Sequence, residues 1–461
     1  MPANRSWTAY QISYRANELN VLARWIAMGT SGCVVGLAGA GKSNLLGFIS
    51  HRSDALQQYL PEGANPYTVI PVDLNNLPAY NLATFYRIIL RAFYEVRHRF
   101  DKELQESITD IYQEYKRSRD PFLSQSALRE LLLLLQKQQM RVVLVFDRFD
   151  KFCQVAPPQV ADSLRGLRDS FKDTLVYIVG LRQAVEYLPD PTILGELYEV
   201  LDTHVCWVGT MNEDDASQLI SEEMHLTPIK PDDKDVKKML NLSGKHPALL
   251  KSICHWWLTA SSELSSNWRD QLLKESSCQF RLKEIWDGLS QEEQLVLSEV
   301  KKWEDGTAVP DVKRNKPILK QLADKGLVQP DEQSWCINGE LLAAYVFSDF
   351  EQARGKIWRD QKTDILYQGR DPLNNLTPLE NSLLRFFVNR PKTRHSHTTL
   401  IEAVWPEDEI VQVGVATERL YQVIKELRRK IEPTAPQWRY IITWRGRPEG
   451  GYQFFPEGRP E

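Results

Sequence analysis

The stretch Gly36-Leu37-Ala38-Gly39-Ala40-Gly41-Lys42-Ser43 decides the fold of this 461-residue chain. It has the full G-x-x-x-x-G-K-[ST] spacing. The apolar run Cys33-Val34-Val35 leads into it, and a helix-forming segment from Asn44 to Ile49 follows. Glycines let the backbone curl so that successive N–H groups point at phosphate oxygens, and a helix N-terminus adds the positive end of its dipole. The pattern therefore predicts strand, phosphate-binding loop and helix, instead of a glycine-rich turn that only joins two elements.

The residues that close this loop predict how a nucleotide would be held. Lys42 is long enough to reach the β- and γ-phosphates, and the hydroxyl of Ser43 can ligate Mg²⁺. The expected contacts come from the loop and the first helical turn: Gly36, Gly39, Gly41, Lys42, Ser43 and Asn44. ATP or ADP, together with Mg²⁺, is therefore the expected cofactor set.

The size and composition of the chain limit its class of fold and its partners. A chain of 461 residues is too long for one hydrophobic core, and about three or four domains are expected. The net charge of −4 gives no general attraction to nucleic acid, so DNA binding would need a local basic patch. The six cysteines lack C-x-x-C spacing, which argues against a disulfide framework or a zinc site. Residues 1–7 lack an apolar signal core and no apolar run could span a membrane, so we expect a cytoplasmic protein without a membrane partner.

Four further apolar runs follow the first strand, and each is typical of a buried parallel strand: Tyr67–Val72, Val142–Phe146, Leu175–Val179 and Val205–Val208. Helical segments separate the runs, at 83–103, 105–117, 124–139 and 158–171. A helix within 8–28 precedes them, and Tyr10 to Arg15 are candidates to line an adenine pocket, although packing alone would also explain them. Five strands alternating with helices predict a doubly wound α/β P-loop NTPase fold with its ligand at the carboxyl ends of the strands.

Three charged residues lie just after two of these strands. Asp147 follows the third strand and fits the Walker B aspartate that holds Mg²⁺ through water, with a solvated acid as the alternative. Asp150 is the only nearby acid free to polarise an attacking water. Arg182 follows the fourth strand and could sense the γ-phosphate, or could be an ordinary surface arginine.

Residues 15–260 resemble the AAA+-related STAND class of signal-transduction ATPases, which is also close to the origin-recognition ATPases. The stretch Tyr14-Arg15-Ala16-Asn17-Glu18-Leu19 resembles their opening R-x-x-E-L motif. The stretch Leu242-Ser243-Gly244-Lys245-His246-Pro247-Ala248-Leu249-Leu250 resembles their G-x-P lid motif. The resemblance implies that His246 and Pro247 face the nucleotide, and a plain helix-start turn is the alternative.

One departure from the AAA+ pattern bears on catalysis. Many AAA+ machines carry an acidic residue directly after the Walker B aspartate, and this chain has Arg148 there. The Asp147-x-x-Asp150 spacing is more similar to the NACHT branch. A missing catalytic acid predicts slow hydrolysis, which suits a switch better than a motor. Arg165 and Arg168 are the candidates for an arginine finger.

The resemblance also implies an architecture in which a helical lid and a winged helix follow the core. Two helical segments, then Pro317–Lys325 and a small hairpin, predict that middle winged helix. Its candidate recognition helix, with the residue just before it, mixes Lys316, Lys320 and Lys325 with Asp324, and we favour a packing and transmission role over DNA binding. The expected divisions are a lead-in helix (1–28), ATPase core (29–210), lid (211–278), middle winged helix (279–352), linker (353–372) and terminal DNA-binding module (373–456).

The terminal module begins with Thr377 as a helix cap, Pro378 in the first turn and Glu380 three residues past the cap. A second, short helix spans Thr398 to Trp405. A third, from about 413 to 431, has one apolar stripe: Leu420, Val423, Ile424, Leu427 and Ile431. Its opposite side and flank carry Arg419, Gln422, Lys425 and Arg429, a set suited to the major groove.

A hairpin follows this helix, with Arg445 and Arg447 at its turn, where they could touch phosphate or the minor groove. The order of these elements over residues 376–455 strongly resembles the OmpR-type winged-helix DNA-binding domain of bacterial response regulators. The wing turn is longer than in that family, by Arg447-Pro448-Glu449, and the loop before the third helix is acidic. A charged helix that serves a protein interface is the alternative.

We therefore predict an ATP-dependent switch that couples nucleotide binding and slow hydrolysis to double-stranded DNA and transcription, with homo-oligomerisation through the ATPase core. A DNA-remodelling or initiator ATPase shares the same modules, and robust DNA-stimulated turnover would favour it. A defence or signalling ATPase whose terminal module binds protein is the third reading. Absence of duplex affinity at low salt would favour that one.

Overall fold

The protein is described from a computed structural model. The residues that it describes are 10–52, 54–74, 77, 79–188, 190–225, 227, 230–259, 267–307, 309–331, 334–350, 355–360, 363–369, 371–405, 417–432, 438–446 and 450–458. Backbone contacts divide the chain into two units. The first comprises residues 1–288, 320–327 and 338–341, and the second comprises 289–319, 328–337 and 342–461.

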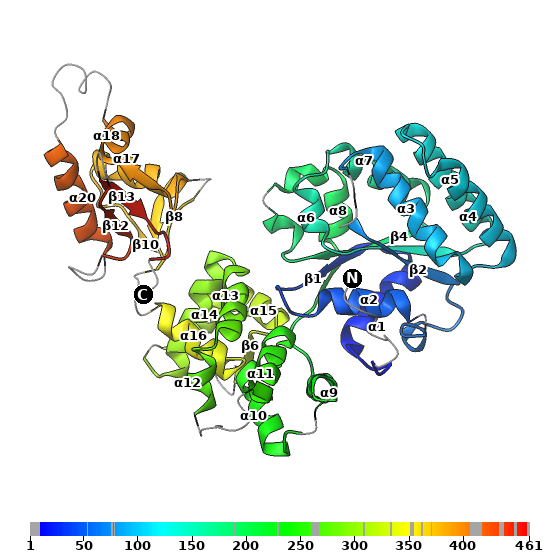
Figure 1. The fold of residues 1–461 in the computed structure, drawn as a ribbon, viewed down its shortest axis with the longest axis horizontal. Helices are drawn as coiled ribbons and strands as arrows, with labels where there is room; N and C mark the ends of the chain where they lie inside the picture. The colour runs from blue at the N-terminus through cyan, green and yellow to red at the C-terminus, as the bar shows by residue number, and fades with distance from the viewer. Residues whose placement is uncertain are drawn as a thin grey trace. The chain divides into compact units, whose positions relative to one another are not determined.

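A five-stranded parallel sheet forms the centre of the first unit (Figure 1). Its strands are β1 (Gly32–Val35), β2 (Tyr67–Val72), β3 (Arg141–Phe146), β4 (Leu175–Leu181) and β5 (Val205–Trp207). The spatial order is β2-β3-β4-β1-β5, and every neighbouring pair is parallel. The prediction of a doubly wound parallel sheet is confirmed.

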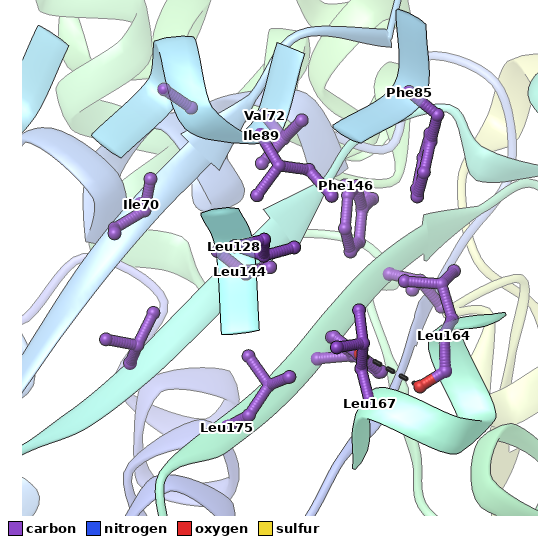
Figure 2. Packing of buried hydrophobic residues seen from close by; sticks show 14 of the residues in the cluster. Ile70, Val72, Phe85, Ile89, Leu128, Leu144, Phe146, Leu164, Leu167 and Leu175 are labelled. Carbon is purple, nitrogen blue, oxygen red and sulfur yellow. Dashed lines mark hydrogen bonds between the residues drawn. The ribbon is translucent and has the colours of Figure 1, made fainter. Parts of the chain in front are cut away.

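Helices cover both faces of this sheet because alternate residues of each strand point to opposite sides. In β3, Val143 and Val145 pack with α1 (Ala16–Met28) and α2 (Lys42–His51). Leu144 and Phe146 pack into the larger cluster on the other face, part of which Figure 2 shows. The helices of that face are α3 (Leu82–Val96), α4 (Lys102–Tyr115), α5 (Pro121–Lys137), α6 (Phe149–Cys153), α7 (Gln159–Ser170) and α8 (Leu197–Asp202).

Helices follow the sheet in the predicted lid region. They are α9 (Glu213–Glu223), α10 (Asp233–Ser243), α11 (Pro247–Thr259) and α12 (Trp268–Leu272). The next helix, α13 (Ser276–Asp287), crosses from this region into the predicted middle winged helix. The side chains of Asn212 and Asp232 accept hydrogen bonds from the first turns of α9 and α10, which fixes where these helices begin. Gly244, with a φ of 56°, ends α10 and leads into the turn before α11.

The middle segment has the element order of a winged helix. It contains α14 (Gln291–Glu304), α15 (Val312–Asp324), the hairpin of β6 (Val328–Asp331) and β7 (Ser334–Ile337), and α16 (Glu340–Phe350). The two chain segments that flank the hairpin, 320–327 and 338–341, belong to the first unit.

These flanking segments contact the core and the lid through what we call the glycine junction, formed by Thr210, Gly244, Gly326 and Asn338. The Asn338 amide donates to the carbonyls of Gly326 (2.9 Å) and Gly244 (3.1 Å) and to Thr210 Oγ1 (3.3 Å). A Cβ at Gly244 would lie 2.4 Å from Asn338 O, and one at Gly326 would lie 2.5 Å from Thr210 N. Only glycine permits this backbone approach.

In its described residues the terminal module contains two small sheets and three helices. Its strands are β8 (Ile357–Arg359), β9 (Leu366–Gln368), β10 (Asp371–Pro372), β11 (Arg394–Ser396), β12 (Ile441–Trp444) and β13 (Gly451–Phe454). Its helices are α17 (Pro378–Asn389), α18 (His397–Val404) and α20 (Thr417–Ile431). Thr377 and Glu380 form the expected capping box at α17, and β11-β13-β12 includes the expected hairpin.

The structure differs from the predicted linker at 353–372. Strands β8, β9 and β10 form an antiparallel sheet within that range, and Ile357 and Leu366 are buried in the core of the terminal module. These strands are two or three residues long, so the alternation of polar and apolar residues was too short to indicate strands. The terminal module therefore begins before residue 357.

Candidate nucleotide and nucleic-acid sites

The loop between β1 and α2 has the backbone of a phosphate cradle. Gly39 and Gly41 have φ angles of 77° and 100°, a region that favours glycine. A Cβ at Gly36 would lie 2.5 Å from Val208 O, so the chain needs glycine there as well. The six predicted contact residues, Gly36 to Asn44, lie together at the carboxyl end of β1 and the first turn of α2.

Lys42 lies against this loop. Its ammonium donates to the carbonyl of Gly36 at 2.6 Å. Burial lowers the pKa of Lys42 to about 8, and the nearby carboxylates of Asp147 and Asp150 act in the opposite direction. The guanidinium groups of Arg182 and Arg148 add to the lowering. A phosphate placed beside this ammonium would restore its preference for the charged form.

The carboxyl ends of β3 and β4 bring the other predicted residues to the same edge of the sheet. Asp147 follows β3, and its Oδ1 accepts the Arg148 N–H at 2.9 Å. Arg148 is exposed in the left-handed region (φ 57°) and begins α6, which contains Asp150. Arg182 follows β4, which pairs with both β1 and β3, and its side chain is exposed. The predicted set of Lys42, Asp147, Asp150 and Arg182 is therefore clustered.

Ser43 and Asp147 fit a Mg²⁺ ion that also binds a nucleotide. Ser43 is exposed at the first turn of α2, and Asp147 is half-buried at the neighbouring strand end. The described residues contain no group of three or more His, Cys, Asp or Glu that could hold a metal. Mg²⁺ is usually held by one or two protein groups together with phosphates and water, and Ser43 and Asp147 could supply the two protein groups.

The lid touches the loop directly. The N–H of Ala248, in α11, donates to Gly39 O at 3.2 Å. A Cβ at Gly39 would lie 2.5 Å from the Cβ of Ala248 and 3.1 Å from Cε1 of His246. Burial lowers the pKa of His246 to about 3, so its ring is neutral at physiological pH. Its buried Nε2 has no hydrogen-bond partner within the described part of the chain.

A pocket next to the loop brings Asn44 and Pro247 together with Tyr10 and Tyr14, from the segment 10–15 that the sequence offered as a candidate adenine wall. Its other lining residues were not singled out by sequence reasoning. With the side chains in these positions the pocket is narrow and has room for little more than one water molecule. Its lining residues are Tyr10, Tyr14, Asn44, Met211, Asp215, Gln218, Leu219, Glu222, Pro247 and Lys251. Burial raises the pKa of Asp215 and raises that of Tyr14 to about 12. The walls of the pocket combine aromatic and apolar side chains with a few polar groups, so a base could enter only if these side chains moved apart.

The two arginine-finger candidates make hydrogen bonds within their own chain. Arg168 donates to Gly29 O (2.7 Å) and Ser31 Oγ (3.3 Å), just before β1 and so at the amino end of the sheet. Arg165 pairs with Asp169 and donates to Glu196 O. Arg168 thus stabilises the edge of the sheet opposite the phosphate loop.

Helix α20 has the predicted division into a core stripe and an exposed face. Leu420, Ile424, Leu427 and Ile431 are buried. Arg419, Gln422, Lys425 and Arg429 are exposed, and Arg429 pairs with Glu426 at 2.8 Å.

Sequence reasoning missed Arg428, which lies on the buried side of α20. It donates to Ile441 O at 2.6 Å and to Thr443 Oγ1 at 2.9 Å, and it stacks over the rings of Trp438 and Tyr452. Arg428 thereby fastens the hairpin to the helix. The basic run in the last turn of α20 was its only signal, because both acceptors lie more than ten residues further along the chain.

The hairpin forms the second part of this surface. Arg445 is exposed after β12, and Arg447 lies outside the described residues. Residues from α18, α20 and the hairpin line an open pocket of about 460 Å³: His397, Tyr421, Thr443, Trp444, Arg445, Gly446, Gly450 and Tyr452. These lining residues include an arginine and no carboxylate, so the pocket favours an anionic group.

The comparisons with known proteins found one matching family model, for the terminal module, and several similar solved structures. Residues 371–454 match the family described as "Transcriptional regulatory protein, C terminal". The prediction of an OmpR-type winged helix is thereby confirmed for the terminal module. Among curated sequences, none matches this chain.

Several solved structures are similar to this chain at low sequence identity. A Walker-type ATPase of Pyrococcus abyssi is 14% identical to this chain, with a TM-score of 0.40. The match covers 72% of this chain and 95% of the other. The ORC2 protein of Aeropyrum pernix, in ADPNP–ADP complexes, is 14% identical, with coverages of 76% and 93% and a TM-score of 0.36. The RuvB Holliday junction branch migration motor of Thermotoga maritima is 11% identical, with coverages of 72% and 95% and a TM-score of 0.30.

Within the described ranges, none of the helices is both long and apolar enough to cross a lipid bilayer.

Proposed function

We propose that this protein is an ATP-dependent switch of the STAND type that couples its nucleotide state to DNA binding and so regulates transcription. The observation that carries the proposal is the joining, in one chain, of two parts. One is a phosphate-binding loop that its lid contacts through Ala248, and the other is a module that matches transcriptional regulators. A switch needs both a ligand site and an element that the ligand can bias.

In this proposal the nucleotide phosphates bind the N–H groups of the loop and the Lys42 ammonium. Mg²⁺ is held by Ser43 and, through water, by Asp147, where it would neutralise phosphate charge. Arg182 senses the γ-phosphate from the end of β4. The base lies in the pocket beside Asn44, and the unpartnered Nε2 of His246 supplies the lid with a polar group near the loop.

Hydrolysis is slow in this proposal because the position after Asp147 holds a cation. The exposed guanidinium of Arg148 cannot accept a proton from water, so Asp150 is left as the acid that could polarise the nucleophile. Slow turnover lengthens the lifetime of the ATP state, which a switch requires.

The DNA-binding surface comprises the exposed face of α20 and the hairpin. Lys425, Gln422 and Arg429 would face the major groove, with Arg419 on the flank. Arg445, together with Arg447 of the undescribed turn, would contact the phosphate backbone. We further propose that the ATP form assembles into a homo-oligomer through the ATPase core.

The test is to measure size and duplex binding in parallel, with ADP and with a non-hydrolysable ATP analogue, on the parent and on Lys42→Ala. We expect the analogue to change duplex affinity or assembly in the parent and to have no effect on Lys42→Ala. If the parent has the same size and the same duplex affinity with ADP as with the analogue, its nucleotide state is not coupled to DNA binding. Fast DNA-stimulated turnover would indicate a remodelling ATPase instead, and no duplex affinity at low salt would indicate a protein-binding module.

A further inference from the structure

The Arg15 side chain contacts two separate segments around the nucleotide loop and pairs with Glu18 of α1 at 3.0 Å. Arg15 is only 2% exposed and directly precedes α1. Its Nη2 donates to the carbonyl of Ala40 at 2.7 Å. Its Nη1 donates to the carbonyls of Gly209 and Thr210, each at 3.0 Å, where the chain leaves β5 for the lid. The guanidinium thus joins the loop to the connection between sheet and lid.

The bond to Ala40 fixes the direction of a phosphate-binding group. The carbonyl of residue 40 and the N–H of Gly41 belong to one planar peptide and point in opposite directions when that peptide is trans. Because the carbonyl points to Arg15, the Gly41 N–H points to the other side of the peptide plane. Gly41 precedes Lys42, so this N–H belongs to the set that a P-loop presents to phosphate.

The backbone of Arg15 is also held in an unusual conformation. Its φ and ψ are 55° and 42°, in the left-handed region that residues other than glycine rarely adopt. Its N–H donates to Oδ2 of Asp215 at 3.0 Å, in the first turn of the lid helix α9. Such a conformation persists where several contacts determine it together, and it is often found at ligand sites.

We propose that Arg15 is a positioning residue for the phosphates of a bound nucleoside di- or triphosphate. Its guanidinium orients the Gly41 N–H toward the phosphates and ties the loop to the start of the lid. This role rests on the proposed nucleotide site and adds a residue that does not itself touch the nucleotide.

The test uses the full chain and two ligands that differ in their phosphates. Binding of ADP with Mg²⁺ and of adenosine is measured by displacement of a fluorescent ADP analogue. Arg15→Gly removes the guanidinium and leaves a residue that adopts the left-handed conformation without strain. Arg24→Ala is the matched control, because Arg24 is exposed on the same helix α1.

We expect Arg15→Gly to weaken ADP binding about tenfold or more, the loss that corresponds to a hydrogen bond with a charged group. Adenosine binding should stay unchanged, and Arg24→Ala should bind both ligands as the parent does. Unchanged ADP affinity would overturn the proposal. An equal loss of ADP and adenosine would also overturn it, because it would show that Arg15 only holds the fold.

If circular dichroism shows that Arg15→Gly is unfolded, Arg15→Lys decides the question. Lysine keeps the positive charge, but its single ammonium lacks the planar fork that reaches three carbonyls. A loss of affinity confined to ADP would support the proposal, and parental ADP affinity would overturn it. Failure of the parent chain to bind ADP would reject the nucleotide site itself, and this role with it.

Discussion

We expect Lys42 to couple nucleotide binding to pH. Burial lowers its pKa to about 8, and a bound phosphate would favour the charged form. Below pH 8 the free protein already carries the charge, whereas above pH 8 binding requires proton uptake. We therefore expect ADP affinity to fall about tenfold between pH 7 and pH 9, as measured by calorimetry. Lys42→Arg keeps its charge throughout and should lose this slope, and the same slope in both proteins would contradict the assignment.

Arg148 occupies the position at which an acid would promote hydrolysis. Its backbone begins α6 in the left-handed region next to Asp147, and its side chain is exposed. Arg148→Glu should raise the rate of phosphate release from ATP by roughly tenfold, which is less than the gain from an optimally placed base. Arg148→Gln removes the cation without adding a base and serves as the control. An equal rise in both variants would show that only the loss of charge matters.

Helix α20 should govern duplex affinity without affecting the nucleotide site. Arg429 is exposed on it and pairs only weakly with Glu426, because surface ion pairs are screened by water. Arg429→Glu should weaken duplex binding and reduce the salt slope by about one unit, the change expected for one lost phosphate contact. Arg24→Glu, on helix α1, changes the net charge by the same amount away from this face and is the control. Gel shifts at several salt concentrations measure duplex binding by the parent and by both variants. If Arg429→Glu binds the duplex as tightly as the parent does, this face of α20 has no role in DNA binding.

The hairpin should depend on Arg428 for its place against α20. Arg428→Ala would leave the buried carbonyl of Ile441 without its donor, and we expect a loss of about 2–3 kcal/mol in the stability of the terminal module. Urea unfolding followed by tryptophan fluorescence measures this, and Trp438 lies next to the substituted side chain. ADP affinity should be unchanged. A module as stable as the parent's would contradict the fastening role.

The elements that the sequence predicted well are those with long, regular patterns. The run Tyr67–Val72 coincides with β2, and the apolar stripe of α20 is buried as expected. Arg15 was not recognised as a contact hub because its acceptors lie 25, 194 and 195 residues away, where no local pattern extends. The strands β8 to β10 were missed because each is too short to show alternation. The phosphate loop was predictable because its chemistry requires fixed residue types at fixed spacing.

At the scale of the whole molecule, the folded sheet β8-β9-β10 shortens the connection to the DNA-binding module. Helix α16 ends at Phe350, and Gly355 already accepts a hydrogen bond from the Tyr440 hydroxyl. These ends are separated by five residue steps (355 − 350 = 5), which span at most about 18 Å. A short connection of this kind can pass a change of position from the middle segment to the terminal module.

Lengthening this connection tests that role. We expect a Gly/Ser insertion of about 20 residues, with an average end-to-end distance near 25 Å, to abolish the effect of nucleotide on duplex binding. Duplex affinity in ADP and ADP affinity should both stay parental. A proline-rich insertion of equal length compares a stiff connection with a flexible one. Nucleotide-dependent duplex binding that survives the flexible insertion would show that coupling does not depend on this connection.

The contacts of the glycine junction are uncharged, and this has a consequence for purifying the protein. They join backbone atoms with the hydroxyl of Thr210 and the neutral amide of Asn338. Dissolved ions act on charges and leave such contacts nearly unchanged, whereas adhesion to a polyanion weakens steeply as salt is added. A concentrated salt wash during purification should therefore strip cellular nucleic acid from the chain and leave core, lid and the roots of the middle hairpin assembled.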